Sequence, residues 1–328
     1  MSALFENKVV LVTGSGQGVG RAVALAFGTE GAKVVTNNRK PGSTGRVSLT
    51  DEVYETLSPE RRKEYDDINA SISGDAESTA QKIIGAGGAA LPVYADISKP
   101  EDAERLVRTA VDAYGTIDIV VNVAGAFGDS PLTEMSMELW DKVNNIKPRG
   151  YFSVMKYAIP YMQKKGWGRI INCSSKANLG DVFSKFAEYC TANAGVMGLT
   201  RAAACEFYSE GITVNAFAPW ARTRASYDGE FLHWDEIQSM GVDFAITADT
   251  TPTPESLCPF LLYLCTDDAA DITGSLFTVY GNTVQLHQQP IIMNTIAKAG
   301  NEFWTVDELR AEVPRNLLVD YKNILAYQ

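Results

Sequence analysis

The chain alternates short apolar runs with longer segments in which apolar residues recur at helical spacing. The apolar runs are rich in β-branched residues and lie at 8–13, 32–37, 90–95, 117–123, 168–174, 212–218 and 275–280. Strands this apolar, separated by helices, are typical of a parallel sheet that helices cover on both faces. The pattern therefore predicts an α/β fold, a doubly wound parallel sheet of the Rossmann type in a single elaborated domain.

Two segments depart from this alternation. Residues 40–74 stand where a strand would normally turn directly into a helix, and Ser58 followed by Pro59 predicts a helix start inside them. Residues 284–328 follow the last predicted strand, and Thr305 there is a typical first residue for a short amphipathic helix. Both segments are charged and polar enough to lie at the surface.

These departures define the expected organisation of the chain. We predict a domain over 1–283 that contains the insert 40–74, and a C-terminal extension over 284–328. Both segments are either surface decoration or elements that fold against the pocket mouth or a neighbouring subunit. The second reading is favoured for the insert, because its apolar residues have a helical spacing that would bury one face. These residues are Leu49, Val53, Tyr54 and Leu57.

Composition narrows the classes of partner. The 328 residues include 40 acidic and 29 basic side chains, a net charge of −11, and no run of Lys or Arg stands out. A basic patch is what tracks phosphates, so nucleic acid is not an expected partner. The segment before the first strand lacks the features of a signal peptide, and no apolar stretch reaches membrane-spanning length. These features predict a cytoplasmic location and no membrane partner.

Cysteine and histidine usage argues against metal and disulfide chemistry. The five cysteines form an odd number without a C-x-x-C pair, which is typical of reduced thiols that pack as small hydrophobic side chains. The two histidines, His233 and His287, are far apart and lack ligand-spaced neighbours. No metal site is therefore expected.

A glycine-rich loop follows the first predicted strand and opens a helix. Its glycines are Gly14, Gly18 and Gly20, within TGSGQGVGRAVALAFG. Glycine permits a tight turn and a close approach of the backbone to a pyrophosphate, whose charge is favoured at a helix N-terminus. The loop therefore predicts a dinucleotide site.

The end of the second predicted strand bears on which dinucleotide binds. An acidic residue here would accept hydrogen bonds from the ribose of NAD and repel the extra phosphate of NADP. The chain has Asn38 instead, followed by Arg39, which is either a partner for the 2′-phosphate or a solvated surface charge. We predict that NADP(H) is favoured over NAD(H).

Several motifs in order resemble the short-chain dehydrogenase/reductase family over roughly residues 7–283. They are Thr13-Gly14-x-x-x-Gly18-x-Gly20, Asp96-Ile97, the turn 122–125, and a Ser-Ser pair upstream of a tyrosine. The resemblance implies that Asp96 lies near the adenine, that the turn 122–125 lies behind the cofactor, and that Thr223 lies near the nicotinamide amide. The implied cofactor-binding set is Gly14, Ser15, Gln17, Gly18, Val19, Gly20, Asn38, Arg39, Asp96, Ile97, Asn122, Ala124, Gly125, Pro219 and Thr223.

The resemblance also implies catalytic roles. Ser175 would position the substrate oxygen, with Ser174 in reserve because the spacing to the tyrosine is one residue longer than usual. Tyr189 would exchange the proton. The family's lysine four residues later is Asn193 here, whereas the family's upstream asparagine position holds Lys147. The lysine and the asparagine of the family's relay thus exchange places in this chain.

The exchange predicts that Lys147 supplies the positive charge that a catalytic phenol needs, because an unaided phenol ionises only near pH ~10. Pro148 follows directly and predicts an irregular helix. Two alternatives remain: Lys147 reaches solvent beside the proline, or Lys176 or Lys185 supplies the charge.

Trp220 stands where the family typically has a glycine beside the nicotinamide. Its indole would narrow the substrate pocket, stack on an aromatic substrate or obstruct the cofactor. The stretch 253–274 and the tail beyond the last predicted strand are similar to hydroxyacyl-CoA dehydrogenase relatives, but no basic patch for the phosphates of an acyl-CoA is evident. The expected substrate is therefore bulky and apolar, aromatic or acyl-type.

Three functional hypotheses follow. The first is an NADP(H)-dependent oxidoreductase that interconverts a carbonyl and a secondary alcohol. The second is a non-catalytic, cofactor-binding subunit of a hetero-oligomer, because the lysine is lost from its usual position. The third uses NADP(H) in a cyclisation or isomerisation. The resemblance further implies a homodimer or homotetramer built on helices around 149–165 and 190–207.

Overall fold

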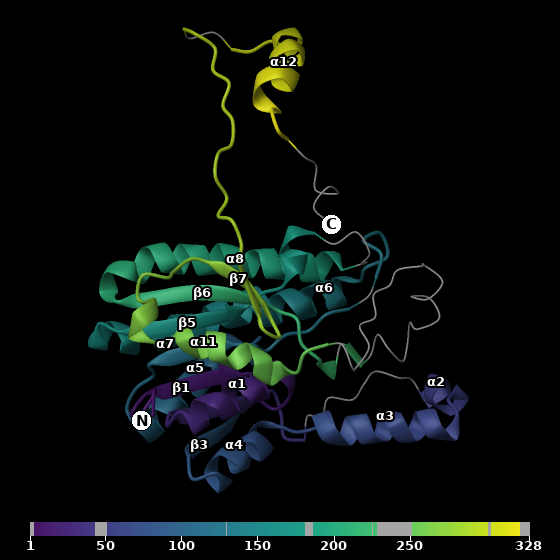
Figure 1. Ribbon diagram of the computed structural model, residues 1–328, viewed down its shortest axis with the longest axis vertical. Helices are drawn as coiled ribbons and strands as arrows, with labels where there is room; N and C mark the ends of the chain where they lie inside the picture. The colour runs from purple at the N-terminus through teal and green to yellow at the C-terminus, as the bar shows by residue number, and fades with distance from the viewer. Residues whose placement is uncertain are drawn as a thin grey trace.

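The computed structural model describes residues 3–42, 51–128, 130–180, 186–224, 226–227, 251–300 and 303–321. Within these residues the chain forms one sheet of eight strands in the order β3-β2-β1-β4-β5-β6-β7-β8 (Figure 1). The strands are β1 Val9–Thr13, β2 Lys33–Asn38, β3 Ala89–Tyr94, β4 Ile119–Asn122, β5 Gly168–Cys173, β6 Ile212–Pro219, β7 Leu276–Tyr280 and β8 Thr283–Leu286. All described pairs are parallel except β7–β8, so the predicted doubly wound parallel sheet is confirmed.

Helices cover both faces of the sheet. One apolar core joins α1 (Gly18–Thr29) and α11 (Cys258–Tyr263) to the sheet, and α4 (Ala76–Gly85) packs beside them. The core on the other face joins α5 (Pro100–Tyr114), α7 (Gly150–Lys165) and α8 (Ala187–Phe207). Along β1, Val10 and Val12 enter the first core and Leu11 the second, as alternation along a strand requires. Both faces of the sheet are therefore buried.

The remaining helices are short or lie outside the two layers. They are α2 Asp51–Thr56, α3 Pro59–Ile72, α6 Met137–Asn144, α12 Val306–Glu312, the π-helices Asn145–Arg149 and Val313–Leu317, and the 3₁₀ turns Lys176–Leu179, Tyr208–Glu210, Pro254–Leu257 and Asp267–Ala269. Among the described residues no helix is both long and apolar enough to cross a membrane.

Strand β8 extends the sheet beyond the boundary expected at residue 283. It folds back on β7 through the turn at Gly281, whose φ is +51°, and pairs antiparallel with it. The strand was not predicted because it is an exposed edge strand, which needs no apolar run. His287 and Gln289 still hydrogen-bond to the domain, so the extension leaves it only beyond Gln289.

The insert forms helices α2 and α3 and a small apolar cluster of its own. Ser58 caps α3 by accepting a hydrogen bond from the Arg61 N–H at 3.3 Å, as the sequence predicts. The cluster contains Tyr54, Leu57, Tyr65, Ile68, Ile72 and also Tyr227 from the segment after β6. The insert thus packs against the segment that borders the active-site cavity described below. Leu49 and the side chain of Val53 fall outside the described residues.

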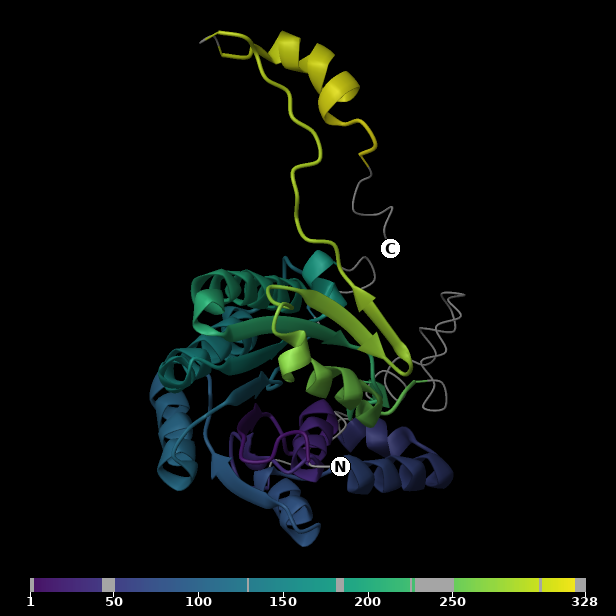
Figure 2. The same ribbon diagram turned by 60° about the vertical axis from the view of Figure 1, so that its left-hand side comes forward.

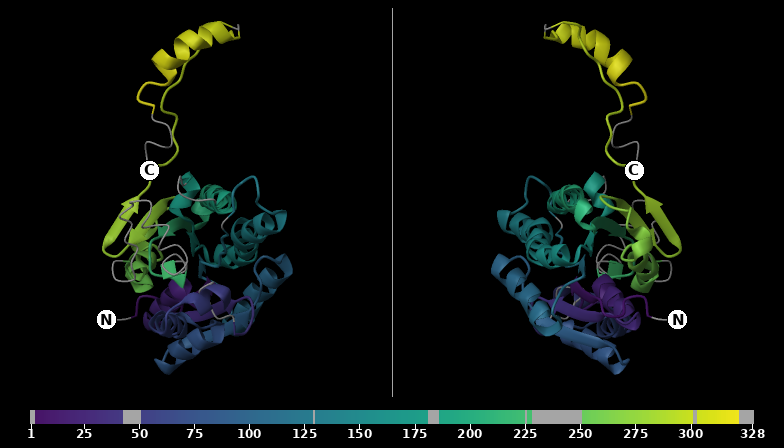
Figure 3. Two further views of the ribbon diagram at one scale, coloured as in Figure 1. Left: turned by 90° about the vertical axis from the view of Figure 1, so that its right-hand side faces the viewer. Right: turned by 90° about the vertical axis from the view of Figure 1, so that its left-hand side faces the viewer.

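The C-terminal extension stands away from the domain in every view (Figures 1, 2 and 3). Thr305 caps α12 and Glu308 completes a capping box, so the predicted helix start is confirmed. Asn294 donates hydrogen bonds to the carbonyls of Leu317 and Val319, which closes the extension on itself. Ile292 is 85% exposed and Phe303 92%. Beyond Gln289, the described residues of the extension stand away from the domain, and contact with a neighbouring subunit remains a prediction.

Candidate active site

The glycine loop lies where the sheet order reverses, because β1 pairs with β2 on one side and with β4 on the other. Gly14 has a φ of +66°, and a Cβ there would lie 2.7 Å from the Cα of Ala124. A Cβ at Gly20 would lie 2.3 Å from the carbonyl oxygen of Gly14. Both positions therefore exclude any side chain, and the loop presses against the turn after β4.

Two polar residues, Thr13 and Ser15, hold this loop in place. The Thr13 hydroxyl accepts hydrogen bonds from the N–H groups of Val123 at 3.0 Å and Ala124 at 3.3 Å. The Ser15 hydroxyl accepts one from the Asn37 N–H at 2.8 Å. Gln17 occupies the N-cap of α1 without a side-chain cap, so the first N–H groups of the helix remain available to an anion. The loop and the turn 122–125 thus meet, and the position of the turn behind the cofactor remains a prediction.

The end of β2 carries a buried oxygen without a partner. The Asn38 Oδ1 has no hydrogen bond, and it lies 2.1 Å from the position that a Cβ would take on Gly16. A buried amide oxygen normally finds a donor, so this atom fits a ligand that supplies one, such as a ribose hydroxyl. Arg39 is exposed and, in the part of the chain that the structure describes, has no ion pair. These residues fit the adenosine half of a dinucleotide.

Two carboxylates, those of Asp75 and Asp96, belong to the part of the site that fits the adenosine half of the dinucleotide. Asp75 accepts hydrogen bonds from the Ser78 and Gly42 N–H groups and from the Tyr94 hydroxyl, at 2.9, 3.0 and 2.8 Å. Asp96 lies directly after β3 and accepts a hydrogen bond from the Ser98 hydroxyl at 2.7 Å, next to Ile97. Each carboxylate is thus tied to neighbouring loops and helps to shape the site.

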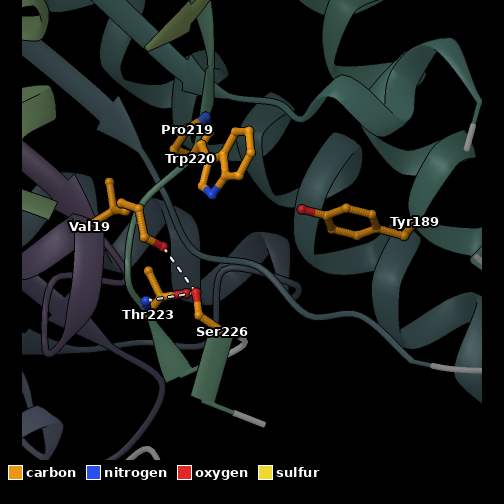
Figure 4. Close-up of a pocket in the computed structure, with 7 residues that line it drawn as sticks. Val19, Tyr189, Pro219, Trp220, Thr223 and Ser226 are labelled. Atoms are coloured by element: carbon orange, nitrogen blue, oxygen red, sulfur yellow. Dashed lines mark hydrogen bonds between the residues drawn. The ribbon is translucent and has the colours of Figure 1, made fainter. Parts of the chain in front are cut away.

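A cavity of about 320 Å³ opens beside the glycine loop (Figure 4). It is lined by Val19, Tyr189, Pro219, Trp220, Ala221, Thr223 and Ser226. The Tyr189 hydroxyl points into it toward the indole of Trp220 (Figure 4). The cavity therefore brings the start of α1, the start of α8 and the segment after β6 to one place.

Lys147 lies buried below this tyrosine. The residue is 3% exposed and belongs to the π-helix Asn145–Arg149, which contains Pro148 and confirms the predicted irregular helix. Its Nζ donates hydrogen bonds to Asn193 Oδ1 at 2.7 Å and to the Cys173 carbonyl at 2.8 Å. The same Nζ lies 5.3 Å from the centroid of the Tyr189 ring. The alternative in which Lys147 reaches solvent is therefore wrong.

The buried ammonium has no anionic partner among the described residues. The ion pairs of that part of the chain do not include Lys147, and only carbonyl oxygens and ring faces surround it. Its charge opposes the rise that burial causes in the pKa of the Cys173 thiol. A buried cation without a counter-ion stabilises the negatively charged form of a neighbouring ionisable group.

Asn193 links the lysine to the tyrosine backbone. Its side chain accepts from Lys147 through Oδ1 and donates through Nδ2 to the Tyr189 carbonyl at 2.8 Å. On the other side, a Cβ on Gly125 would lie 3.1 Å from the Lys147 Cε. The turn after β4 is thus shaped to the stem of this lysine.

The two candidate serines have different surroundings. The Ser174 hydroxyl is buried and donates to the Asn193 carbonyl at 3.2 Å. Ser175 is half-buried and caps the turn Lys176–Leu179 by accepting a hydrogen bond from the Ala177 N–H at 3.2 Å. The buried serine is therefore committed to α8, and Ser175 keeps its free donor. Lys185 lies outside the described residues.

Four further residues of the site carry no signal in the sequence. Ser226 lines the cavity. The Tyr151 hydroxyl donates a hydrogen bond to the Ala124 carbonyl at 2.9 Å, and burial raises the pKa of Tyr151 well above its usual value. Phe127 contacts Tyr189 with ring centroids 6.2 Å apart. Glu188 is buried, and one of its oxygens accepts from the Gly128 N–H at 2.9 Å. Tyr151 and Phe127 meet the site through packing between distant segments, whereas Glu188 and Ser226 lie close in the chain to Tyr189 and Thr223 but match no motif.

Comparisons with known proteins agree with this geometry. The family described as Enoyl-(Acyl carrier protein) reductase matches residues 65–281. The Peroxisomal multifunctional enzyme A of Dictyostelium discoideum is 32% identical over 85% of this chain, which spans 54% of that protein. The (2S)-[(R)-hydroxy(phenyl)methyl]succinyl-CoA dehydrogenase subunit BbsD of Thauera aromatica is 30% identical over 84% of this chain and 96% of its own length. The crystal structure of a short chain dehydrogenase from Mycobacterium avium aligns with a TM-score of 0.71 and 29% identity, over 96% of this chain and 95% of that one.

Proposed function

The chain belongs to the short-chain dehydrogenase/reductase family, and from this membership we propose that it is an NADP(H)-dependent oxidoreductase. In this proposal it interconverts a carbonyl and a secondary alcohol on an acyl-type substrate. Two comparisons support this substrate class. The name of the matching family refers to an acyl carrier protein, and the name of the Thauera relative refers to a CoA thioester. The bound nicotinamide would supply or accept the hydride.

Tyr189 is the proposed acid or base. Its hydroxyl faces the cavity, and the observation that carries the proposal is the uncompensated ammonium of Lys147, 5.3 Å from its ring centroid. When the phenol gives its proton to a nascent alkoxide, the phenolate becomes the counter-ion that Lys147 lacks. Ser175 donates a hydrogen bond to the same substrate oxygen. Asn193 holds the ammonium in place through its side-chain oxygen.

Turnover tests this assignment directly. Oxidation of NADPH is followed with a panel of aryl, alkyl and acyl-thioester ketones, for the wild type and for Tyr189→Phe. We expect turnover in the wild type and a loss of about 100-fold or more in the variant, because general acid–base catalysis typically contributes that much. Tight cofactor binding without turnover on any substrate would instead favour the non-catalytic subunit.

The preference for NADP(H) rests on the end of β2. Asn38 brings no charge to repel a 2′-phosphate, and the exposed Arg39 has no ion pair in the described residues to compete for its guanidinium. Dissociation constants for NADPH and NADH are measured by fluorescence. Arg39→Ala should weaken NADPH about ten-fold or more and leave NADH unchanged.

Two further variants complete this test. Asn38→Asp should reverse the preference, because a carboxylate accepts from the ribose hydroxyl of NADH and repels the phosphate of NADPH. Lys40→Ala is the matched control, because Lys40 is a neighbouring exposed cation. Wild-type protein that binds NADH as tightly as NADPH would contradict the assignment.

A further inference from the structure

Trp220 occupies the middle of the active-site cavity. Its backbone N–H donates to the Val279 carbonyl at 3.0 Å, which fixes the start of the segment after β6. The Tyr280 ring packs 5.6 Å from the indole, and the Lys176 Nζ lies 5.9 Å from the indole centroid. The indole is nevertheless 39% exposed and extends toward the Tyr189 hydroxyl (Figure 4). A large aromatic ring that is held in place and exposed on one face can contact a ligand without first being ordered.

Aromatic rings also gather on the side of the cavity that carries Tyr189. The rings of Phe127, Phe186 and Tyr189 contact one another edge to face, with centroids 6.2 to 6.5 Å apart. Phe127 comes from the loop after β4 and is 41% exposed. Phe127 and Phe186 are not among the residues that line the cavity, so they support the Tyr189 ring from behind. A ligand whose oxygen reaches Tyr189 therefore meets this ring on one side and the indole on the other.

The size of the cavity limits the shape of the ligand. Its volume of about 320 Å³ is close to the lower limit for small-molecule sites. Val19 and Thr223 line the part that, by the family resemblance, borders the nicotinamide. The remaining space lies between the indole and the tyrosine hydroxyl, and a flat ring can stack on the open face of the indole, whereas a puckered or branched group cannot.

We propose that Trp220 determines substrate specificity, and that the space between it and Tyr189 takes a planar aryl group bonded to the reacting carbon. The substrate is then an aryl ketone or the corresponding secondary alcohol. This inference rests on the proposed function, because the aryl group is placed relative to the oxygen that contacts Tyr189. It goes beyond that function by naming which substituent the site selects.

Binding of two amides to the cofactor-loaded protein tests the inference without requiring turnover. Benzamide and cyclohexanecarboxamide carry the same carbonyl group on a planar and a puckered ring, and both serve as non-reacting probes. Calorimetry gives their dissociation constants. We expect the wild type to bind benzamide about five-fold more tightly, because ring stacking adds to the apolar contact that both probes make.

Variants at position 220 assign the preference to the indole. Trp220→Phe should keep most of the preference, and Trp220→Leu should reduce it to less than about two-fold while keeping apolar bulk. Tyr208→Leu is the matched control, because Tyr208 is an exposed ring at the far end of α8, about 28 Å along the helix from Tyr189. It should leave both constants unchanged.

The outcomes separate this inference from the catalytic proposal. Equal binding of the two amides by the wild type, binding of neither, or a preference that survives in Trp220→Leu would each overturn the aryl assignment. An indole-dependent preference in a protein that turns over no ketone would support the aryl site and contradict the catalytic role of Tyr189. Turnover of alkyl ketones together with equal amide binding would do the reverse.

Discussion

Replacement of Lys147 by methionine is the sharpest perturbation of the proposed mechanism. Methionine keeps an unbranched apolar stem beside Gly125 and removes the ammonium that bonds to Asn193 and to the Cys173 carbonyl. The change therefore deletes a buried charge with little loss of volume. Because two buried oxygens lose the hydrogen bond from Lys147, the variant is less stable. Circular dichroism and thermal unfolding are therefore used to check that it is folded.

The structure sets the size of the expected effect. Two unit charges separated by the 5.3 Å between the Lys147 Nζ and the Tyr189 ring centroid attract by about 3 kcal/mol at an effective dielectric of about 20. Loss of that attraction disfavours the phenolate by the same amount, which is roughly a 100-fold change in an equilibrium constant. We expect turnover near neutral pH to fall by about that factor. The alkaline limb of the pH–rate profile should move to higher pH, because the phenolate loses a neighbouring positive charge.

The assay is a set of pH–rate profiles with a saturating cofactor and the best ketone or alcohol of the substrate panel. Four proteins are compared: the wild type, Lys147→Met, Asn193→Lys and the double variant Lys147→Asn/Asn193→Lys. The double variant returns each residue to the position that it has in the family. It should retain more turnover than Lys147→Met, because an ammonium is again present beside the tyrosine.

An unchanged profile for Lys147→Met would refute this reasoning and show that the charge comes from elsewhere. Lys176 would then be the next residue to replace, although its Nζ lies beside Trp220. A double variant no better than Lys147→Met would show that the two positions are not interchangeable. Both results are readable only in a protein that turns over, so the substrate panel is measured first.

Further predictions concern the support of the lysine and the two added segments. Gly125→Ala places a Cβ 3.1 Å from the Lys147 Cε and should lower turnover about ten-fold; in a Lys147→Met background, which has no ammonium to displace, the same change should cost less, and equal costs in both backgrounds would show that the loss does not act through the ammonium. Truncation after Leu286 removes an arm that exposes Ile292 and Phe303, and light scattering should then show a smaller oligomer; an unchanged oligomer would show that the arm is decoration. Tyr65→Ala removes a buried ring from the insert's contact with Tyr227 and should lower the melting temperature by several degrees, whereas the exposed Lys63→Ala should not.

Most of the fold can be predicted from the chain because its signals are local. Seven apolar runs coincide with strands within one or two residues, and Ser58 and Thr305 begin helices as their capping chemistry requires. Edge strand β8 escaped prediction because an exposed strand carries no apolar run. The course of the extension escaped for another reason: its helix signal is local, whereas its course depends on contacts that no local pattern specifies.

The candidate site divides in the same way. The order of motifs identifies the glycine loop, Tyr189 and the exchanged positions 147 and 193, because each position is recognised from the residues beside it in the chain. No such pattern shows that the Lys147 ammonium is buried, that it lies 2.7 Å from Asn193 Oδ1, or that it lacks a counter-ion among the described residues. Those facts depend on the π-helix that aims the lysine inward and on α8, which packs against it.

The sequence by itself thus determined the elements, their order and the chemical groups available to the site. Periodicity, capping and glycine spacing act over a few residues, so they are legible in the chain. The tertiary structure alone decided which of those groups meet. Trp220, Phe127 and Phe186 come from segments that follow β6, β4 and β5, and they converge on Tyr189 because parallel strands end at one edge of the sheet. Phe186 is only three residues from Tyr189, but Trp220 and Phe127 reach this tyrosine's surroundings by packing between elements far apart in the chain, which no local pattern records.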